Sequence, residues 1–286
     1  MNAPVVEKLR QLFGERLRLE QGIRQQFCQA PPGIERSPAE AVVTVRSEDE
    51  IIQVVKLCRE YGVALIPSGA RSSLEGQINA PQGGVCVDCS EMNAIVDVNV
   101  TDMTATVQPG VTREQLNSHL RETGLFFSVD PGANASMGGM AATRASGTNS
   151  VRYGTMAGNV KAARWIMADG SVAAIGSRAP KSAMGLDLLA IAIGSEGTLG
   201  IFSELQVRLH PVPEAIVAGV CSFDSVDNAV QTVASALGQG LSIARIELLD
   251  ATAVRACNAY SAALGLVETP HLFLQFHGDR STDASS

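Results

Sequence analysis

Residues 130–154 form a long stretch that is rich in glycine, alanine and serine and holds almost no large side chains. A chain gives up core packing over such a length where its backbone must approach another molecule closely. Small residues let main-chain N–H groups reach an anion or a flat ring. The segment therefore predicts a bound ligand, and one that carries phosphate groups.

The composition narrows the class of protein. A length of 286 residues suggests about two domains, and 45% hydrophobic residues provide for a sizeable core. The net charge is −7 and no run of lysine and arginine occurs. Because nucleic-acid binding needs clustered basic residues, we expect no nucleic-acid partner.

The sequence also carries expectations about location. No apolar run approaches the roughly 20 residues that a bilayer span needs, and the first residues lack the apolar core of a secretory signal. Six cysteines in such a chain are expected to be reduced thiols. We expect a cytoplasmic protein without a transmembrane segment, with peripheral attachment at the inner membrane as the alternative.

Capping signals place the helices of the first half. Ser47 and Glu50 have capping-box spacing before a helical apolar pattern that Gly62 ends. Thr112 and Gln115 repeat this spacing at the start of a helix predicted over 112–123. In the first 40 residues we expect one amphipathic helix followed by a polar approach.

Short apolar runs predict the strands. Asp169-Gly170 between two such runs predicts a hairpin of strands 160–168 and 171–175. The other strands are expected at 63–66, 84–88, 94–98 and 104–108, with one more that ends near residue 209.

The texture of the chain changes at Pro211-Val212-Pro213. After this point we expect strand 216–223, helix 225–237, strand 242–248, helix 250–264 and strand 271–277. Such an alternating pattern indicates a core of its own. We divide the chain into an N-terminal helical segment (1–37), a first domain (38–213) and a partial second domain (214–286).

Two cysteines and one histidine are candidates for metal ligands because of their positions in the sequence. Cys86 and Cys89 lie three apart at the end of a strand, where they face opposite sides, and no second cysteine pair is near. His277-Gly278-Asp279 follows a strand without a partner ligand at usable spacing. Structural roles are therefore expected for all three, and no metal site is assigned.

Three loops of small residues occur in the first domain, at 67–76, 130–154 and 194–200. No Gly-x-Gly-x-x-Gly and no P-loop pattern is present, which disfavours a nicotinamide-linked enzyme. Three such loops next to strand ends or helix starts suggest one elongated ligand that crosses several backbone segments. A dinucleotide has that shape, and amide nests would hold its pyrophosphate.

The order of these motifs resembles the FAD-binding domain of the vanillyl-alcohol oxidase type, also called PCMH-type. The resemblance covers about residues 40–278 and is strongest to flavin-dependent D-lactate dehydrogenases and the glycolate oxidase D-subunit. It implies an α+β fold, in which an FAD-binding PCMH-type domain of two α/β subdomains precedes part of a ferredoxin-like cap domain. The matching motifs include Gly83-Gly84-Val85, Pro109-Gly110-Val111-Thr112, Asp130-Pro131-Gly132, Ala145-Ser146-Gly147, Ala168-Asp169-Gly170 and Lys181-Ser182.

The resemblance implies FAD as the cofactor and assigns a part of it to each loop. The first loop would wrap the pyrophosphate with backbone amides, the second would line the flavin and its ribityl chain, and the third would close over the adenosine side. The residues carried over are Pro67, Gly69, Ala70, Arg71, Ser72, Ser73 and Leu74; Asp130, Pro131, Gly132, Ala133, Met137, Gly138, Gly139, Ala142, Thr143, Ser146, Gly147, Tyr153 and Gly154; and Glu196, Gly197 and Ile201.

The activity implied by the resemblance is that of an FAD-dependent oxidoreductase. A D-2-hydroxy acid such as D-lactate or glycolate would be oxidised to the 2-oxo acid by hydride transfer to flavin N5. Cytochrome c, a quinone or a partner flavoprotein would accept the electrons, and a partner subunit or a homodimer is the assembly considered. The alternative is a non-catalytic subunit that keeps the FAD fold and acts through a partner chain.

The chain departs from the family pattern at several places. Arg71 and Ser73 stand where the family usually has glycine, and Leu186 stands where it has tyrosine. Relatives continue well past residue 286, so the catalytic base, the carboxylate-binding groups and the ligands of any divalent metal are expected outside this sequence. We therefore assign no catalytic residue, and expect FAD binding with little turnover.

Overall fold

The computed structural model describes residues 3–28, 33–179, 181–183, 185–261 and 263–278. It divides into two compact units. The larger unit comprises Met1–Phe127, Pro131–Ala145 and Thr155–His210. The smaller unit comprises Ser128–Asp130, Ser146–Gly154 and Pro211–Ser286, so Asp130 and residues 146–154 of the glycine-rich stretch belong to it.

The first sheet of the larger unit has four strands in the order β1-β2-β4-β3. Strands β2, β4 and β3 are parallel, and β1 is antiparallel to β2. Every residue of β4 is buried, as expected for a central strand of a parallel sheet. The bounds are β1 Leu17–Arg18, β2 Ala41–Thr44, β3 Leu65–Ser68 and β4 Val85–Asp88.

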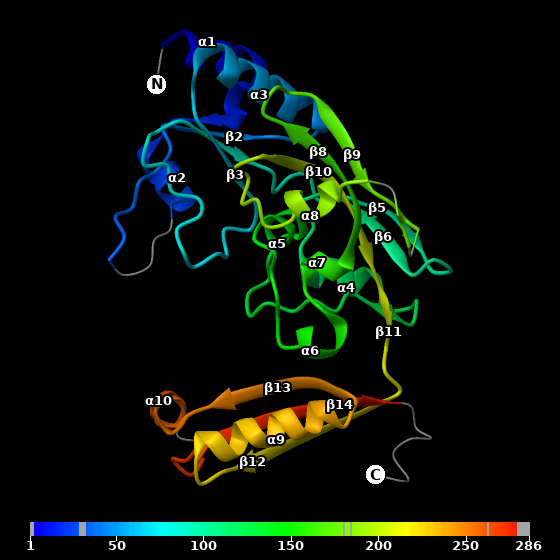
Figure 1. Cartoon of the computed structure of the whole chain (residues 1–286). Coiled ribbons are helices and arrows are strands. Elements are labelled where there is room, and N and C mark those ends of the chain that lie inside the picture. Colours follow the sequence, from blue (N-terminus) through cyan, green and yellow to red (C-terminus); the bar gives the residue numbers. More distant parts are fainter. Residues whose placement is uncertain (1–2, 29–32, 180, 184, 262, 279–286) are drawn as a thin grey trace. The chain divides into compact units, whose positions relative to one another are not determined.

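The second sheet of the larger unit is antiparallel and has the order β5-β6-β10-β8-β9 (Figure 1). The hairpin predicted across Asp169-Gly170 is present, and Gly170 takes the left-handed φ of 79° that such a turn favours. The bounds are β5 Ile95–Asn99, β6 Thr104–Val107, β8 Val160–Met167, β9 Val172–Gly176 and β10 Gly200–Arg208.

The first 40 residues differ from the prediction of a single helix. Helix α1 (Ala3–Phe13) ends at Gly14, which has a φ of 54°, and Leu17 then pairs with Val43 in the first sheet. A 3-10 turn (Gly14–Arg16) lies between α1 and strand β1. A short helix α2 (Gln21–Arg24) and a second 3-10 turn (Gln25–Phe27) come after this strand. The sequence did not predict strand β1, because two residues are too few to show the alternation of apolar and polar side chains that marks a strand.

Helix α3 (Glu48–Tyr61) has the predicted start and end. The Ser47 hydroxyl accepts from the Glu50 amide at 3.2 Å, and Gly62 ends the helix with a φ of 65°. The reciprocal half of the capping box is absent, because the Glu50 carboxylate accepts instead from the Arg46 amide and the Arg16 guanidinium, both at 2.7 Å. Helix α4 (Arg113–His119) starts at the predicted cap and is shorter than predicted.

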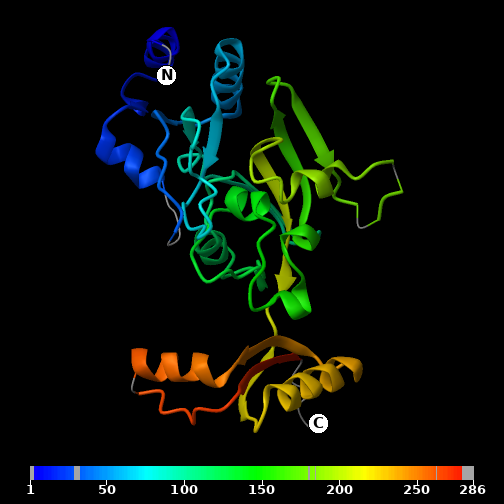
Figure 2. The same cartoon turned by 60° about the vertical axis from the view of Figure 1, so that its left-hand side comes forward.

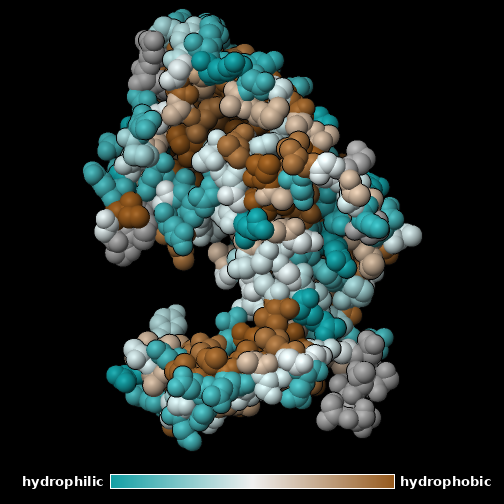
Figure 3. Space-filling view, in the orientation of Figure 1, coloured by the Kyte–Doolittle hydropathy of each residue, from teal (hydrophilic) through white to brown (hydrophobic). Residues whose placement is uncertain are grey.

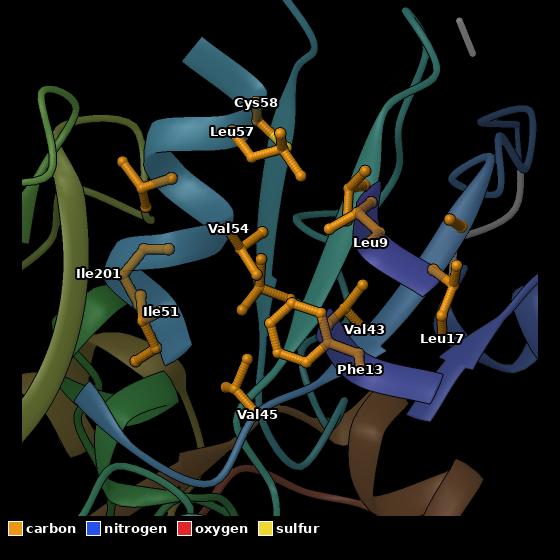
Figure 4. Close-up of a cluster of buried hydrophobic side chains, with 14 of the residues drawn as sticks. Leu9, Phe13, Leu17, Val43, Val45, Ile51, Val54, Leu57, Cys58 and Ile201 are labelled. Carbon is orange, nitrogen blue, oxygen red and sulfur yellow. The ribbon is translucent and has the colours of Figure 1, made fainter. Parts of the chain in front are cut away.

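One apolar cluster joins α1, α3 and both sheets. Leu9 and Phe13 from α1 and Ile51 and Val54 from α3 belong to this cluster, and Ile201 of β10 joins it beside Ile51 (Figure 4). Helix α3 packs on β4 of one sheet and on β10 of the other, so it connects the two subdomains (Figure 2). The short elements of this unit are β7 Leu125–Phe126, α5 Met137–Ala142, α7 Met156–Asn159 and α8 Leu188–Ala192.

The C-terminal part of the smaller unit begins at Pro211, within β11 (His210–Pro211), and follows the predicted order of elements. Its antiparallel sheet has the order β12-β14-β13, and the helices α9 and α10 begin at the caps Ser225 and Asp250. Apolar side chains lie at the surface of this unit (Figure 3), among them Ile216 and Val217 of β12 and Leu248 of β13. The bounds are α6 Ser150–Tyr153, β12 Ala215–Ser222, α9 Val226–Gly238, β13 Ile243–Leu249, α10 Ala251–Tyr260 and β14 His271–Gly278.

The cysteines are free thiols. Cys86 and Cys89 are buried, and burial raises the pKa of the Cys89 thiol to about 12. Among the described residues no group of three potential metal ligands occurs, and Asp279 of the His-Gly-Asp motif lies outside those residues. None of the described helices is long and apolar enough to cross a membrane.

Candidate cofactor site

A cavity of about 470 Å³ lies in the larger unit, where its loops converge. Its walls come from the loop after β3, from the segment around α5 and from the turn before β10. The volume is within the range of about 300–1,000 Å³ that is common for small-molecule sites. Each of the three loops singled out from the sequence contributes to it.

Most of the residues carried over from the resemblance line this cavity. Met137 does not, because it points into the core at the start of α5 and is fully buried. Asp130, Ser146, Gly147, Tyr153 and Gly154 belong to the smaller unit. The lining members are Pro67, Gly69, Ala70, Arg71, Ser72, Ser73, Leu74, Pro131, Gly132, Ala133, Gly138, Gly139, Ala142, Thr143, Glu196, Gly197 and Ile201.

Several lining residues were not selected from the sequence. Ser68 and Cys89 stand at the carboxyl ends of the parallel strands β3 and β4, which is where open α/β sheets bind ligands. That rule was available as a signal, but it needs the pairing of the two strands to be known. The others are Gln77, Ile78, Pro109, Ala135, Ser136, Met140, Ala145, Gly200 and Phe202.

The loop after β3 offers open hydrogen-bond donors. Its Ala70 amide donates to the Ser136 hydroxyl at 3.1 Å, which fixes the loop against the segment before α5. The amides of Arg71, Ser72 and Ser73 donate to no other residue in the described part of the chain. Gly69 is required at the contact, because a Cβ there would lie 2.1 Å from Ser136 Oγ.

Arg71 adds a positive charge to this loop. Its guanidinium carbon lies 4.3 Å from the centroid of the Phe27 ring, a favourable cation–π distance. No carboxylate of the described residues forms an ion pair with it. Open amides beside an unpaired guanidinium form a donor set that suits a diphosphate.

Left-handed backbone at residues other than glycine is concentrated around the cavity. Arg71 has a φ of 58°, Arg144 a φ of 52° and Glu196 a φ of 51°. Arg71 and Glu196 line the cavity, and Arg144 stands between the lining residues Thr143 and Ala145. Such backbone costs roughly 1–2 kcal/mol per residue and gathers at functional sites.

The turn before β10 is tied to α5 and to the end of β3. The amides of Gly194 and Glu196 donate to the carbonyls of Ala141 at 3.0 Å and Ala142 at 2.9 Å. Gly197 has a φ of 76°, and a Cβ on it would lie 2.2 Å from Cγ of Pro67. Only glycine therefore allows this turn to close on the first loop.

In the smaller unit, Asp130 organises the 146–154 segment. Its carboxylate accepts from the Thr148 hydroxyl at 2.7 Å and the Asn149 amide at 2.8 Å, and it pairs with Arg245 at 3.2 Å. Gly147 approaches so closely that a Cβ would lie 2.4 Å from Asp130. These contacts give Asp130 a structural role in its own unit.

The imidazole of His210 is a partly buried, acid-sensitive group of the larger unit. Its Nε2 donates to Asn159 Oδ1 at 2.8 Å, and burial with the nearby Arg208 lowers its pKa to about 4. Because the pKa of His210 is lower in the folded state, the unfolded chain takes up a proton at this histidine first as the pH falls below 6.5. The contribution of His210 to the unfolding free energy is therefore complete above about pH 6.5 and is lost towards pH 4.

We expect the unfolding free energy of the larger unit to fall by about 2–3 kcal/mol between pH 6.5 and 4 because of His210. Fluorescence of Trp165, the single tryptophan of the chain, reports this unit in urea titrations. His210→Gln keeps a donor for Asn159 without titrating, so its stability should change much less over this interval. An equal loss in that variant would contradict the assignment.

The comparisons with known proteins agree with this fold and with FAD as the cofactor. Residues 39–176 match the FAD binding domain, and residues 212–286 match the C-terminal domain of FAD linked oxidases. The fold and the site thus define a flavin-binding oxidoreductase architecture. The chain belongs to the FAD-linked oxidases, and its cofactor is FAD.

Curated relatives match nearly the whole chain. A probable mitochondrial D-lactate dehydrogenase of Danio rerio is 45% identical over 278 residues, which are 96% of this chain and 56% of the relative. The mitochondrial D-lactate dehydrogenase [cytochrome] of Arabidopsis thaliana is 44% identical over 239 residues, or 84% and 42%. The glycolate oxidase subunit GlcD of Bacillus subtilis is 31% identical over 233 residues, or 81% and 49%. The chain spans about half the length of the curated relatives it matches.

Solved structures confirm the fold. An alkyldihydroxyacetonephosphate synthase has a TM-score of 0.81 over 98% of this chain and 57% of its own, at 22% identity. At that identity the likeness supports the architecture alone.

Proposed function

We propose that this chain is the FAD-holding part of an FAD-dependent dehydrogenase that converts a D-2-hydroxy acid, D-lactate or glycolate, to the 2-oxo acid. The observation that carries the proposal is the cavity of the larger unit. There, left-handed backbone at Arg71 and Glu196 accompanies open amides and an unpaired guanidinium. The names of the matched relatives supply the substrate class.

The chain's own residues would bind and orient the cofactor. The amides of Arg71, Ser72 and Ser73 and the Arg71 guanidinium would hold the diphosphate, and the turn with Glu196 and Gly197 would close over the adenosine side. FAD supplies, when bound, a two-electron acceptor for the hydride of the hydroxy acid. No residue of this chain is assigned to take the hydroxyl proton.

The remaining expectations stand as part of the proposal. We propose a first domain over 38–213 and a second from 214, which the family matches at 39–176 and 212–286 support. We also propose that the protein is cytoplasmic and that its electrons pass to cytochrome c, a quinone or a flavoprotein. Two of the matched relatives are named mitochondrial, so cell fractionation is needed to determine where this protein is located.

Reconstitution tests the proposal directly. The purified chain is stripped of flavin, incubated with FAD or FMN and desalted, and its absorbance spectrum is recorded. We expect a stoichiometric oxidised-flavin spectrum with FAD and none with FMN, and little dye reduction with D-lactate, L-lactate or glycolate. Absence of flavin after reconstitution would overturn the cofactor role. Dye reduction by L-lactate but not D-lactate would overturn the proposed substrate class.

Arg71 allows charge and backbone strain to be separated. Arg71→Ala and Arg71→Gly both remove the guanidinium, so each should weaken FAD binding about tenfold or more, measured by titration of flavin fluorescence. Only glycine relieves the left-handed backbone. The apoprotein of Arg71→Gly should therefore be about 1 kcal/mol more stable than that of Arg71→Ala. Unchanged FAD affinity in both variants would contradict a diphosphate contact.

A further inference from the structure

The segment before the first domain contributes an aromatic ring to the loop that follows β3. Phe27 lies in the 3-10 turn Gln25–Phe27, upstream of residue 39, where the match to the FAD binding domain begins. Its side chain is 5% exposed, and the guanidinium carbon of Arg71 lies 4.3 Å from the centroid of its ring. Both residues belong to the larger unit, and Arg71 lines the cavity of that unit.

The ring of Phe27 is fixed by packing on the first sheet. It belongs to a buried apolar cluster with Val42 of β2 and Cys86 of β4, and Ile66 of β3 packs against this cluster. Close packing of this kind holds a buried side chain in one rotamer. The ring therefore offers Arg71 a surface with a fixed position.

Hydrogen bonds join the same segment to the far end of the loop that follows β3. The Cys28 thiol donates to Asn79 Oδ1 at 3.0 Å, and the Ala80 amide donates to the Ser37 carbonyl at 2.7 Å. The segment around Phe27 is thus tied to this loop by contacts other than the one between the ring and the guanidinium.

A phenyl ring and a carboxylate differ in what they leave of an arginine. A carboxylate neutralises the guanidinium and accepts its N–H donors, whereas a ring attracts the cation without accepting conventional hydrogen bonds. No carboxylate of the described residues pairs with Arg71, so its donors stay available to an anion in the cavity. A long side chain that is ordered before an anion binds also loses less rotamer freedom when it does bind.

We propose that Phe27 is a positioning residue of the cofactor site, whose ring holds the Arg71 guanidinium ready for the diphosphate of FAD. The proposal rests on the proposed function, because the diphosphate is the ligand assigned there to Arg71. Phe27 is not among the residues that line the cavity, so it acts through Arg71. The N-terminal segment thereby takes part in cofactor binding, although it lies outside the residues that match the FAD binding domain.

The first test needs no cofactor. In the apoprotein with ¹⁵N-labelled arginine, the Nε–H signal of Arg71 is identified by its loss in Arg71→Ala. The ring current of Phe27 should displace this signal from the usual arginine position. In Phe27→Leu, which keeps an apolar side chain but has no ring, the signal should return towards that position. An Arg71 signal that is the same in the wild type and in Phe27→Leu would overturn the proposal.

The second test measures the FAD dissociation constant. Phe27→Leu should raise it about two- to tenfold, which corresponds to ordering one long side chain on binding. Introduction of 3,4,5-trifluorophenylalanine at position 27 keeps the ring and nearly its volume but withdraws negative charge from its face. This change should therefore also weaken FAD binding, by about two- to fivefold. In the Arg71→Ala background neither change should have a further effect on the dissociation constant.

Val42→Ala is the matched control, because it removes apolar volume from the same buried cluster and keeps both the ring and the guanidinium. It should lower stability in urea and bind FAD to within about twofold of the wild type. Equal weakening of FAD binding in Val42→Ala and Phe27→Leu would overturn the positioning role. Tighter binding in Phe27→Leu would overturn it as well, because the ring would then hold Arg71 away from the diphosphate.

The outcomes separate this proposal from the proposed function. If the wild-type chain binds no FAD after reconstitution, the proposed function fails. The Nε–H signal of the apoprotein then still decides whether the ring of Phe27 orders Arg71.

Discussion

Replacing Gly197 by alanine is expected to destabilise the larger unit by about 2–5 kcal/mol and to abolish stoichiometric FAD binding. The left-handed φ of 76° costs an alanine roughly 1–2 kcal/mol. Its Cβ would also lie 2.2 Å from the ring of Pro67, and such overpacking adds about 1–3 kcal/mol. Trp165 fluorescence in urea gives the stability, and desalting after reconstitution gives the flavin content.

Two glycines serve as controls for the separate causes. Gly62 has a similar φ of 65° but open space around a Cβ, so Gly62→Ala should show the backbone cost alone and still bind FAD. Gly132 lines the cavity with neither a positive φ nor a contact, so Gly132→Ala should remain close to wild type in stability. Full flavin content in Gly197→Ala would show that closure of this turn on Pro67 is not needed.

Truncation of Leu9 is expected to give a second large effect, on stability alone. Leu9 of α1 is fully buried in the apolar cluster that includes residues of α3, and Leu9→Ala should cost about 2–5 kcal/mol of unfolding free energy. Leu12 on the same helix is 49% exposed, so Leu12→Ala should cost well under 1 kcal/mol. Equal losses in the two variants, measured by urea unfolding, would contradict a core that spans α1 and α3.

The smaller unit was predictable because its signals are local. Ser225 and Asp250 cap the two helices by accepting from the amides of Asn228 and Ala253. The strands between them carry apolar runs bounded by turn residues. Caps and periodicity act over three or four residues, so the sequence alone reveals them.

The start of the chain was harder to predict for the opposite reason. The pairing of Leu17 with Val43 joins residues far apart in the sequence, and no local pattern marks a strand of two residues. The shift of β3 to Leu65–Ser68 has the same origin, because its register is set by β4. Pairing partners, rather than propensity, decided both.

For the site, the sequence indicated the loops, and the resemblance indicated the cofactor. The lining residues Ser68, Cys89 and Ser136 were missed because they face the cavity only once β3, β4 and α5 are assembled. In the sequence Arg71 stands out only because it replaces the family's usual glycine, and its left-handed backbone is visible only in the folded structure. Its concentration with Arg144 and Glu196 around one cavity is a property of the folded loops.

The amino-acid sequence is enough to show which segments must keep small side chains, where several helices begin and end, and which family the chain resembles. These follow from side-chain size, capping and motif order, all of which are written along the chain. Which of the small residues come into contact depends on how the chain folds. The fold sets Gly197 against Pro67, Gly69 against Ser136, and Tyr153 against His277, which lies 124 residues further on. Such contacts depend on the packing of distant elements, and no local rule contains that information.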